Sequence, residues 1–256
     1  MVEPGRPSIS STLLGTGFAV GTEENRLTSR SVRSFVIRNG RLTKAQQAAL
    51  ENLLPLYGIP FRGQPISSEE MFGNDRPVWL EIGIGNGDAL IHMASMHPEV
   101  NFIGVEVHAP GIGHALQAIE QVGLTNTRLI HHDAVEVLES QLKPGSLERI
   151  LLFCPDPWHK KRHHKRRIVS DEFAALVASR LMPTGLLHCA TDVAEYAHWM
   201  LEVLNQAPGL TNMSSENTFV DKPTWRANTR FEKRGIRLGH VMHDLLFQRN
   251  EERVNP

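Results

Sequence analysis

The chain has 256 residues, of which 27 are basic and 28 acidic, so its formal net charge is −1 and gives no overall attraction to polyanions. The hydrophobic content of 41% is ordinary for a globular protein, and no apolar run approaches the ~20 residues of a membrane span. Two cysteines cannot build a disulfide framework, which indicates a reducing compartment. We therefore expect a cytoplasmic protein without a signal peptide or membrane contact.

The first 77 residues are expected to form two extensions. Residues 1–30 are rich in Ser, Thr, Gly and Pro, and this composition is typical of disorder. Residues 31–77 are expected to be partly helical and otherwise irregular. Thr43 and Gln46 have the spacing of a capping box, which predicts a helix that ends near Leu54. Residues 56–77 contain several Pro and Gly, and we expect no regular structure there.

From residue 78 onward, short apolar runs alternate with segments of helical spacing. The expected strands are 78–82, 102–107, 127–131, 149–154 and 186–190, and the helices that follow them are 86–96, 110–122, 134–141, 170–182 and 193–205. This alternation predicts an α/β domain over residues 78–256, with a parallel sheet covered by helices on both faces. Residues 209–220 and 240–248 also have strand-like character.

A glycine-rich turn joins the first expected strand to the first expected helix. Gly83, Gly85 and Gly87 allow a tight turn and let a ligand lie against the backbone. The glycine spacing alone is also compatible with a plain turn. Glu81, Glu106 and Asp133 strengthen the ligand interpretation, because each ends one of three consecutive strands and would line the crevice where open α/β sheets bind ligands.

The three acids constrain the ligand. Carboxylates repel a pyrophosphate, so a nicotinamide or flavin dinucleotide is disfavoured, whereas Glu106 lies where an acid accepts hydrogen bonds from ribose hydroxyls. S-adenosylmethionine fits better, because it has ribose hydroxyls, an ammonium and a sulfonium but no phosphate. The alternative for any single acid, and for Asp133 in particular, is a helix cap.

A second site is expected after the fourth strand. Pro155 and Pro157 stiffen the loop around Asp156. Trp158 offers a flat face on which a base can stack, although ordinary packing explains it equally well. Six of the eight residues from 160 to 167 are Lys or Arg, which is typical of a clamp for polyanions; the alternative is a solvated face. Since these cations oppose a divalent ion at His159 and His163, we expect no metal.

The motifs together are similar to one known family. The strings LEIGIGNGDAL, GVEVHAPGIG, HHDAVEVL, PDPWHKKRHHKRRIV, HCATD and TRFEKRGIRLGH resemble the bacterial tRNA (guanine-N7-)-methyltransferase family, in the same order, between Ser31 and Arg249. The resemblance implies a Rossmann-like class I methyltransferase fold with a mostly parallel seven-stranded sheet. It also implies methylation of N7 of guanine 46 in the variable loop of tRNA, with S-adenosylmethionine as the donor.

The resemblance assigns roles to individual residues, with Asp156 also as the catalytic residue. The implied donor-binding residues are Glu81, Gly83, Gly85, Gly87, Glu106, Asp133 and Asp156. The implied substrate-binding residues are Lys160, Asp192, Thr229, Arg230, Phe231 and Glu232. The implied RNA-binding residues are Arg162, His163, His164, Lys165, Arg166 and Arg167. Cys154 and Arg230 depart from the family pattern, where a bulky residue and Lys are expected.

The chemistry of guanine N7 agrees with such a site. N7 carries no proton, so its attack on a sulfonium methyl group needs no general base, and catalysis rests on positioning and electrostatics. A fixed carboxylate such as Asp156 or Asp192 would stabilise the positive charge that develops on guanine. Two alternatives stay open: a methyltransferase for another RNA or for a small-molecule amine, and a non-catalytic RNA-binding protein on this scaffold. A monomer and a homodimer are equally compatible with the sequence.

Overall fold

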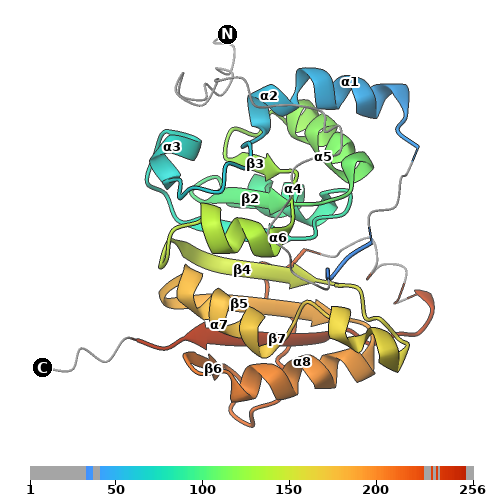
Figure 1. Cartoon of the computed structure of the whole chain (residues 1–256), viewed down its shortest axis with the longest axis vertical. Helices are drawn as coiled ribbons and strands as arrows, with labels where there is room; N and C mark the ends of the chain where they lie inside the picture. Colours follow the sequence, from blue (N-terminus) through green and yellow to red (C-terminus); the bar gives the residue numbers. More distant parts are fainter. Residues whose placement is uncertain (1–32, 37–40, 228–231, 233–234, 236, 252–256) are drawn as a thin grey trace, which may run out of the picture.

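The computed structural model describes residues 33–36, 41–227, 232, 235 and 237–251. The expected disorder of residues 1–30 falls outside this part of the chain. The described strands form one sheet of seven, in the order β3-β2-β1-β4-β5-β7-β6 (Figure 1). They are β1 (Val78–Ile82), β2 (Asn101–Val105), β3 (Thr127–Ile130), β4 (Leu147–Phe153), β5 (Leu181–Thr191), β6 (Leu210–Asn212) and β7 (His243–Arg249).

Six of the seven strands of this sheet point the same way, and β7 alone runs in the opposite direction. The pairs β1–β2, β2–β3, β1–β4 and β4–β5 are parallel, whereas β7 pairs antiparallel with both β5 and β6. Every residue of β1 and β2 is buried, which explains why their sequences are apolar runs without alternation. The predicted mostly parallel, seven-stranded class I architecture is confirmed.

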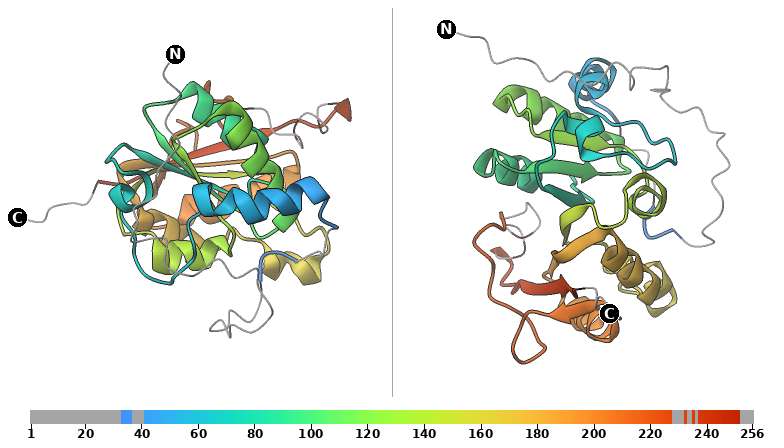
Figure 2. Two further views of the ribbon diagram at one scale, coloured as in Figure 1. Left: turned by 90° about the horizontal axis from the view of Figure 1, so that it is seen from above. Right: turned by 90° about the vertical axis from the view of Figure 1, so that its left-hand side faces the viewer.

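Helices cover both faces of the sheet, as Figure 2 shows. On one face lie α4 (Asp88–Met96) and α5 (Ala109–Val122), with α1 (Lys44–Asn52) packed outside α5. The opposite face carries α6 (Ala134–Glu136), the π-helical turn Val137–Gln141, α7 (Asp171–Arg180) and α8 (Ala194–Gln206). Each layer packs its own apolar cluster against the sheet, so the strand ends are fixed from both sides.

The segment before β1 is more ordered than expected. Thr43 and Gln46 form the predicted capping box at the start of α1. The expectation of irregular structure over 56–77 is wrong in part: α2 (Leu54–Tyr57) reaches Tyr57, and α3 (Ser68–Phe72) begins with a second capping box from Ser67 and Glu70. The amide of Ile59 donates to the Leu129 carbonyl at 2.8 Å, which fastens this segment to the β3 edge of the sheet.

The expected strand over 209–220 is shorter than predicted, since β6 spans only Leu210–Asn212. Because β1 to β5 are parallel, their carboxyl ends meet at one edge of the sheet. That edge carries the predicted acids and the Pro-Asp-Pro loop. No helix in the described part of the chain has the length and apolar character needed to cross a bilayer.

Candidate active site

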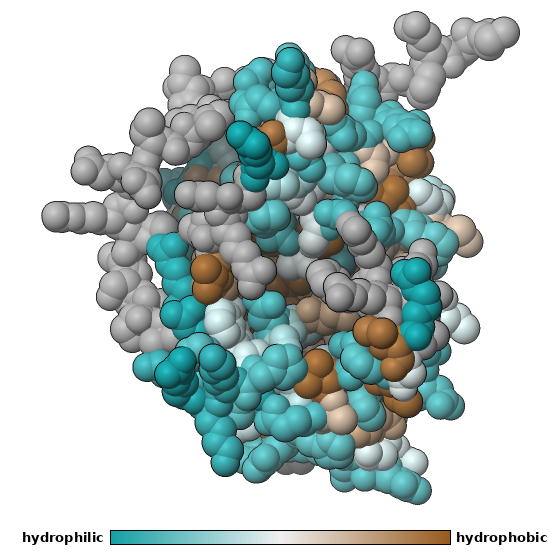
Figure 3. All heavy atoms as spheres, turned by 90° about the vertical axis from the view of Figure 1, so that its right-hand side faces the viewer, coloured by the Kyte–Doolittle hydropathy of each residue, from teal (hydrophilic) through white to brown (hydrophobic). Residues whose placement is uncertain are grey.

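A cavity of about 440 Å³ opens at the carboxyl edge of the strands. Its wall comes from the ends of β1, β2 and β4, from the segments that follow β1 to β4, and from the N-terminal residues Ser34, Phe35 and Val36. Five predicted donor-binding residues line it: Gly83, Gly85, Glu106, Asp133 and Asp156. Figure 3 views the molecule from this side and shows a largely hydrophilic face with apolar residues near its middle.

The glycine turn needs its glycines for two separate reasons. Gly83 (φ +71°) and Gly85 (φ +56°) adopt the left-handed conformation, and a Cβ on either would project into open space. Gly87 (φ +85°) is the N-cap of α4, and its Cβ would meet that of Ala115 at 2.7 Å. Gly111 of α5 lies so close that its Cβ would stand 2.2 Å from the Gly85 carbonyl oxygen. The turn therefore packs closely against α5 on one side, and its other side, at Gly83 and Gly85, is open to a ligand.

Glu106 fixes the shape of the turn. Its Oε2 accepts a hydrogen bond from the Gly85 amide at 2.9 Å, and Oε1 accepts from the amides of Val107 (2.8 Å) and His108 (3.0 Å). These bonds orient the carboxylate at the cavity wall. An ionised carboxylate has about four lone-pair positions, so one position stays available for a further donor.

Asp133 satisfies both interpretations of its sequence position. Its Oδ1 accepts from the Val135 amide at 2.9 Å, which makes Asp133 the N-cap of α6. The residue is also part of the cavity wall. The hydrogen bond to Val135 fixes the Asp133 carboxyl group, and the residue still lines the cavity.

Glu81 is the most unusual acid of the edge. It is 3% exposed and does not line the cavity, although the next two residues, Ile82 and Gly83, do. Its Oε2 has no hydrogen-bond partner among the described residues. Burial, and secondarily the charges of Glu106 and Asp88, raise the pKa of Glu81 to about 8. A buried carboxyl with an unpartnered oxygen is costly, so this arrangement favours a ligand that brings positive charge.

These features fit S-adenosylmethionine. The open glycine turn accommodates a ligand against the backbone, and Glu106 can accept hydrogen bonds from hydroxyl groups. Glu81 can lose its proton and become negatively charged when a cation binds nearby. A phosphate group would face three acids at this edge. The predicted preference for a donor without phosphate therefore agrees with the geometry.

The Pro-Asp-Pro loop brings Asp156 to the same cavity. Asp156 is exposed and lies three residues beyond the end of β4. The preceding turn is sharp, because Cys154 has φ +49° while its amide donates to the Ala190 carbonyl of β5 at 2.7 Å. Positive φ is uncommon for a residue with a side chain, and it re-aims the loop toward the cavity.

Trp158 is engaged with the protein and is not an open stacking platform. Its indole Nε1 donates to the Ser34 carbonyl at 3.2 Å, and the Arg166 guanidinium lies 4.9 Å from the ring centroid. The packing interpretation is thus favoured in this structure. The contact also explains how Ser34 reaches the cavity. No motif predicted that residues 33–36 contribute to the wall, since their partner lies 124 positions away.

The basic run forms a 3₁₀ helix over Lys161–Arg166 with no fully buried side chain. Lys160, Lys161, Arg162 and Lys165 are exposed. Loss of hydration, together with the surrounding cations, lowers the pKa of His163, so this ring adds little positive charge at pH 7. The exposed cations are adjacent to the Asp156 loop. Within the described residues, no group of three or more His, Cys, Asp or Glu is arranged to hold a metal ion.

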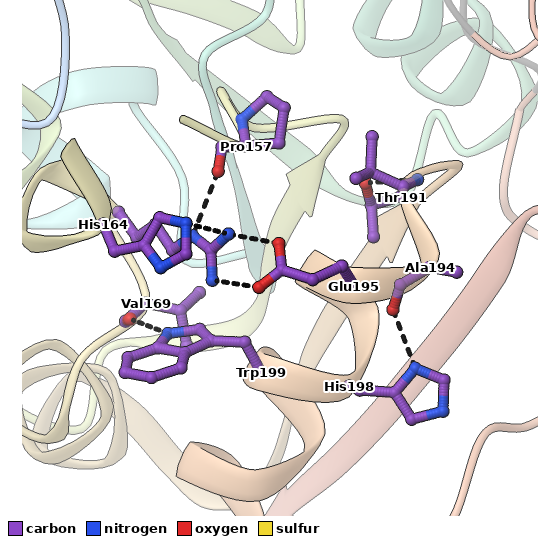
Figure 4. Close-up of polar contacts among 10 residues, drawn as sticks. Pro157, His164, Val169, Thr191, Ala194, Glu195, His198 and Trp199 are labelled. Carbon is purple, nitrogen blue, oxygen red and sulfur yellow. Dashed lines mark hydrogen bonds and ion pairs between the residues drawn. The ribbon is translucent and has the colours of Figure 1, made fainter. Parts of the chain in front are cut away.

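Arg167 is the one fully buried member of the predicted RNA-binding set. Its side chain is 1% exposed and its guanidinium forms a bidentate ion pair with Glu195 of α8 (Figure 4). Nε also donates to the Pro157 carbonyl at 3.0 Å, and the guanidinium lies 4.8 Å from the Tyr196 ring centroid. Arg167 thus fastens the Pro-Asp-Pro loop to α8 and is not available to phosphates.

Apart from Lys160, the predicted substrate residues divide into three groups. Asp192 directly follows β5 and is paired with His240, whose Nδ1 lies 2.8 Å from Oδ2. Glu232 is 3% exposed and forms an ion pair with Arg226 in the interior. Residues 229–231 lie outside the described part of the chain.

Comparison with known proteins shows which family this sequence matches. A family model described as "Putative methyltransferase" matches residues 75–245. The tRNA (guanine-N(7)-)-methyltransferase of Shewanella woodyi is 51% identical over 86% of this chain and 92% of its own length. The enzyme of the same name from Edwardsiella ictaluri is 50% identical, covering 90% of this chain and 96% of the relative.

Solved structures support the fold alone. The 16S rRNA methyltransferase KamB has a TM-score of 0.52 at 14% identity and covers 73% of this chain and 95% of its own. A 16S rRNA (adenine(1408)-N(1))-methyltransferase from Catenulisporales acidiphilia has a TM-score of 0.50 at 15% identity, covering 72% and 90%.

The raised pKa of Glu81 makes a prediction about pH. Below pH 8 the empty site holds Glu81 mostly protonated, and a bound cation favours the ionised form, so binding releases a proton. The affinity for S-adenosylmethionine should therefore rise between about pH 6 and 8 and level off above that range. Glu81→Gln should bind more weakly at pH 8.5 and show a flat profile in calorimetric titrations. Glu51→Gln, at an exposed acid on α1, is the matched control and should keep the wild-type profile; a rising profile in Glu81→Gln would contradict the assignment.

Proposed function

Since the chain belongs to the tRNA (guanine-N7-)-methyltransferase family and transfers the methyl group of S-adenosylmethionine to N7 of guanine in tRNA, we propose that it acts on guanine 46 in the variable loop through the cavity at the strand ends. The observation that carries this proposal is the junction of two surfaces. Asp156 lines the cavity, and the exposed cations begin four residues later at Lys160. Donor and RNA would thus meet at this loop.

In this proposal, Glu106 accepts from the ribose hydroxyls of the donor, and the open turn at Gly83 and Gly85 lies against it. S-adenosylmethionine supplies an electrophilic methyl group on a sulfonium. Glu81 contributes negative charge from beneath the turn, and Asp133 holds its carboxyl at the wall from the α6 cap.

Asp156 acts as an electrostatic and positioning group. N7 of guanine has a lone pair and no proton, so no base is required at this atom. Positive charge spreads over guanine as N7 is alkylated, and the ring N–H groups become stronger donors. A carboxylate on that edge, from Asp156 or Asp192, therefore stabilises the transition state more than the ground state.

Two alternatives lose support. A small-molecule amine substrate would not need the exposed cations from Lys160 to Lys165. A non-catalytic RNA-binding protein would not need a buried, unpaired acid beside an open glycine turn, because that arrangement lowers stability unless a cation compensates it.

The proposed RNA surface consists of Lys160, Lys161, Arg162 and Lys165. These side chains lie in the solvent beside the catalytic loop and can contact phosphates without rearrangement. Because folded RNA is recognised largely through backbone and shape, phosphate contacts should dominate the affinity of this surface.

The role of Asp156 can be tested by Asp156→Asn. The amide keeps the size of the carboxyl but removes its charge, so the single-turnover methyl-transfer rate should fall by roughly 100-fold, the scale of one preorganised electrostatic contact. S-adenosylmethionine affinity, measured by calorimetry, serves to separate chemistry from donor binding. A wild-type rate with donor binding intact would exclude the proposed role.

The RNA surface can be tested by the double variant Arg162→Ala/Lys165→Ala. Loss of two phosphate contacts should weaken tRNA binding and make the slope of log K against log salt shallower by ~1.8. Donor affinity should not change. The matched control is Lys143→Ala, an exposed cation two residues after the π-helical turn and outside the basic run, which should leave the slope unaltered. An unchanged slope in the double variant would place the RNA elsewhere.

A further inference from the structure

The Arg167 guanidinium binds three separate segments of the chain. Nε donates to the carbonyl of Pro157 in the Pro-Asp-Pro loop at 3.0 Å. Nη1 and Nη2 donate to the two carboxylate oxygens of Glu195 on α8. Nη2 also lies 3.2 Å from Nε2 of His164, which belongs to the 3₁₀ helix of the basic run. One side chain therefore joins the proposed catalytic loop, α8 and the basic 3₁₀ helix (Figure 4).

Arg167 is enclosed, whereas its acidic partner is not. The side chain of Arg167 is 1% exposed and that of Glu195 is 60% exposed. The guanidinium lies 4.8 Å from the ring centroid of Tyr196 and 5.5 Å from that of Trp199, both on α8. The hydrogen bond from Arg167 lowers the pKa of Glu195, so the carboxylate stays ionised at neutral pH. Because a buried guanidinium is costly unless its donors are paired, these contacts hold Arg167 in one position.

The bond to Pro157 acts on the residue that carries the proposed chemistry. Pro157 directly follows Asp156, and Ile168 directly follows Arg167; Asp156 and Ile168 both line the cavity. Pro157 has no backbone N–H, so its carbonyl is its only backbone hydrogen-bonding group, and that carbonyl binds Arg167. Since the proline ring also restricts φ, a fixed Pro157 carbonyl limits the freedom of the preceding Asp156.

Glu195 connects the same loop to the segment that carries the other proposed acid. Asp192 directly follows β5, and α8 begins two residues later at Ala194. The strands β4 and β5 are parallel neighbours, so the segments that follow them leave the same edge of the sheet. A bidentate guanidinium–carboxylate pair fixes orientation as well as distance. The Arg167–Glu195 pair therefore fixes the loop after β4, with Asp156, against the start of the helix after β5.

We propose that Arg167 is a positioning residue for methyl transfer: by binding the Pro157 carbonyl and Glu195 together, it holds Asp156 in a fixed place relative to the start of α8. This inference rests on the proposed function, because it requires Asp156 to stabilise the charge that develops on guanine. Lysine at position 167 would keep the charge, but it lacks the planar fork that binds Pro157 and both oxygens of Glu195 at once.

The first test compares Arg167→Lys with Arg128→Lys. Arg128 is also buried, 2% exposed, but it bonds to backbone carbonyls near the β3 edge and does not line the cavity. With both substrates saturating, the single-turnover methyl-transfer rate of Arg167→Lys should fall at least about tenfold, because small displacements at a reacting centre are costly. Arg128→Lys should lower the unfolding temperature but keep the wild-type rate. A wild-type rate in folded Arg167→Lys, or an equal loss in Arg128→Lys, would overturn the proposal.

Glu195→Gln tests the other member of the pair. The amide keeps the shape and one acceptor but loses the charge that holds Arg167, so the single-turnover rate should fall here too. Its matched control is Glu202→Gln, at an exposed acid further along α8, which should keep the wild-type rate. Because Glu195 is mostly exposed, this substitution opens no cavity. Should Arg167→Lys fail to fold, Glu195→Gln decides alone, and a wild-type rate in it is equally contradictory.

Binding of tRNA separates positioning from direct RNA contact. Arg167→Gln removes the charge; a cation that binds a phosphate would make the slope of log K against log salt shallower by ~0.9 when it is removed. A positioning residue should leave that slope unaltered and change the Kd of tRNA by less than about twofold, while the transfer rate falls. A shallower slope together with an unchanged rate at saturation would show that Arg167 contacts RNA, and the proposal would fail.

Asp156→Asn separates this proposal from the proposed function. If Asp156→Asn keeps the wild-type rate, the charge-stabilising role of Asp156 fails, and the route through Arg167 fails with it. If Asp156→Asn slows transfer but Arg167→Lys does not, only the positioning role of Arg167 fails. If Arg167 acts through Asp156, adding Arg167→Lys to Asp156→Asn should cost less than Arg167→Lys costs alone. Additive losses would contradict a shared route.

Discussion

The site depends on acids that are held where parallel strands end. Glu81, Glu106 and Asp133 follow or end three strands of one sheet, and the backbone, not a cation, satisfies the latter two. Glu81 has an unpartnered oxygen within the described structure and a pKa raised to about 8 by burial. Such an edge repels phosphate and attracts a cationic donor, so the choice of S-adenosylmethionine follows from burial and hydrogen bonding around a few carboxyls.

The arginines of this structure are of two kinds, exposed and buried, and only the exposed ones belong to the proposed RNA surface. Exposed cations such as Arg162 are free to meet phosphates, whereas Arg167 and Arg226 are buried in bidentate pairs with Glu195 and Glu232. The buried pairs hold their loops in place, and in the proposed RNA interface the exposed cations supply the affinity. This separation explains how a chain with a net charge of −1 can bind a polyanion without a basic surface overall.

The sequence predicted those features that depend on local pattern. The apolar runs predict the buried strands, and the capping box of Thr43 and Gln46 predicts the start of α1. Side-chain direction was not predictable, because it depends on distant partners: Arg167 belongs to a basic run, yet Glu195 is 28 residues away. The burial of Glu232 is unpredictable for the same reason: Arg226, which binds Glu232, also binds Asp244, and no local motif reveals the antiparallel position of the Asp244 strand beside β5. The contribution of Ser34 to the cavity likewise depends on a contact with Trp158.

The most direct test of this account is to map the methyl group on RNA. An unmodified tRNA transcript is incubated with the protein and labelled S-adenosylmethionine, and the product is cleaved chemically at N7-methylguanine. The account predicts one cleavage position, at guanine 46 in the variable loop. Label incorporation without cleavage there, or cleavage at another guanine, would contradict it.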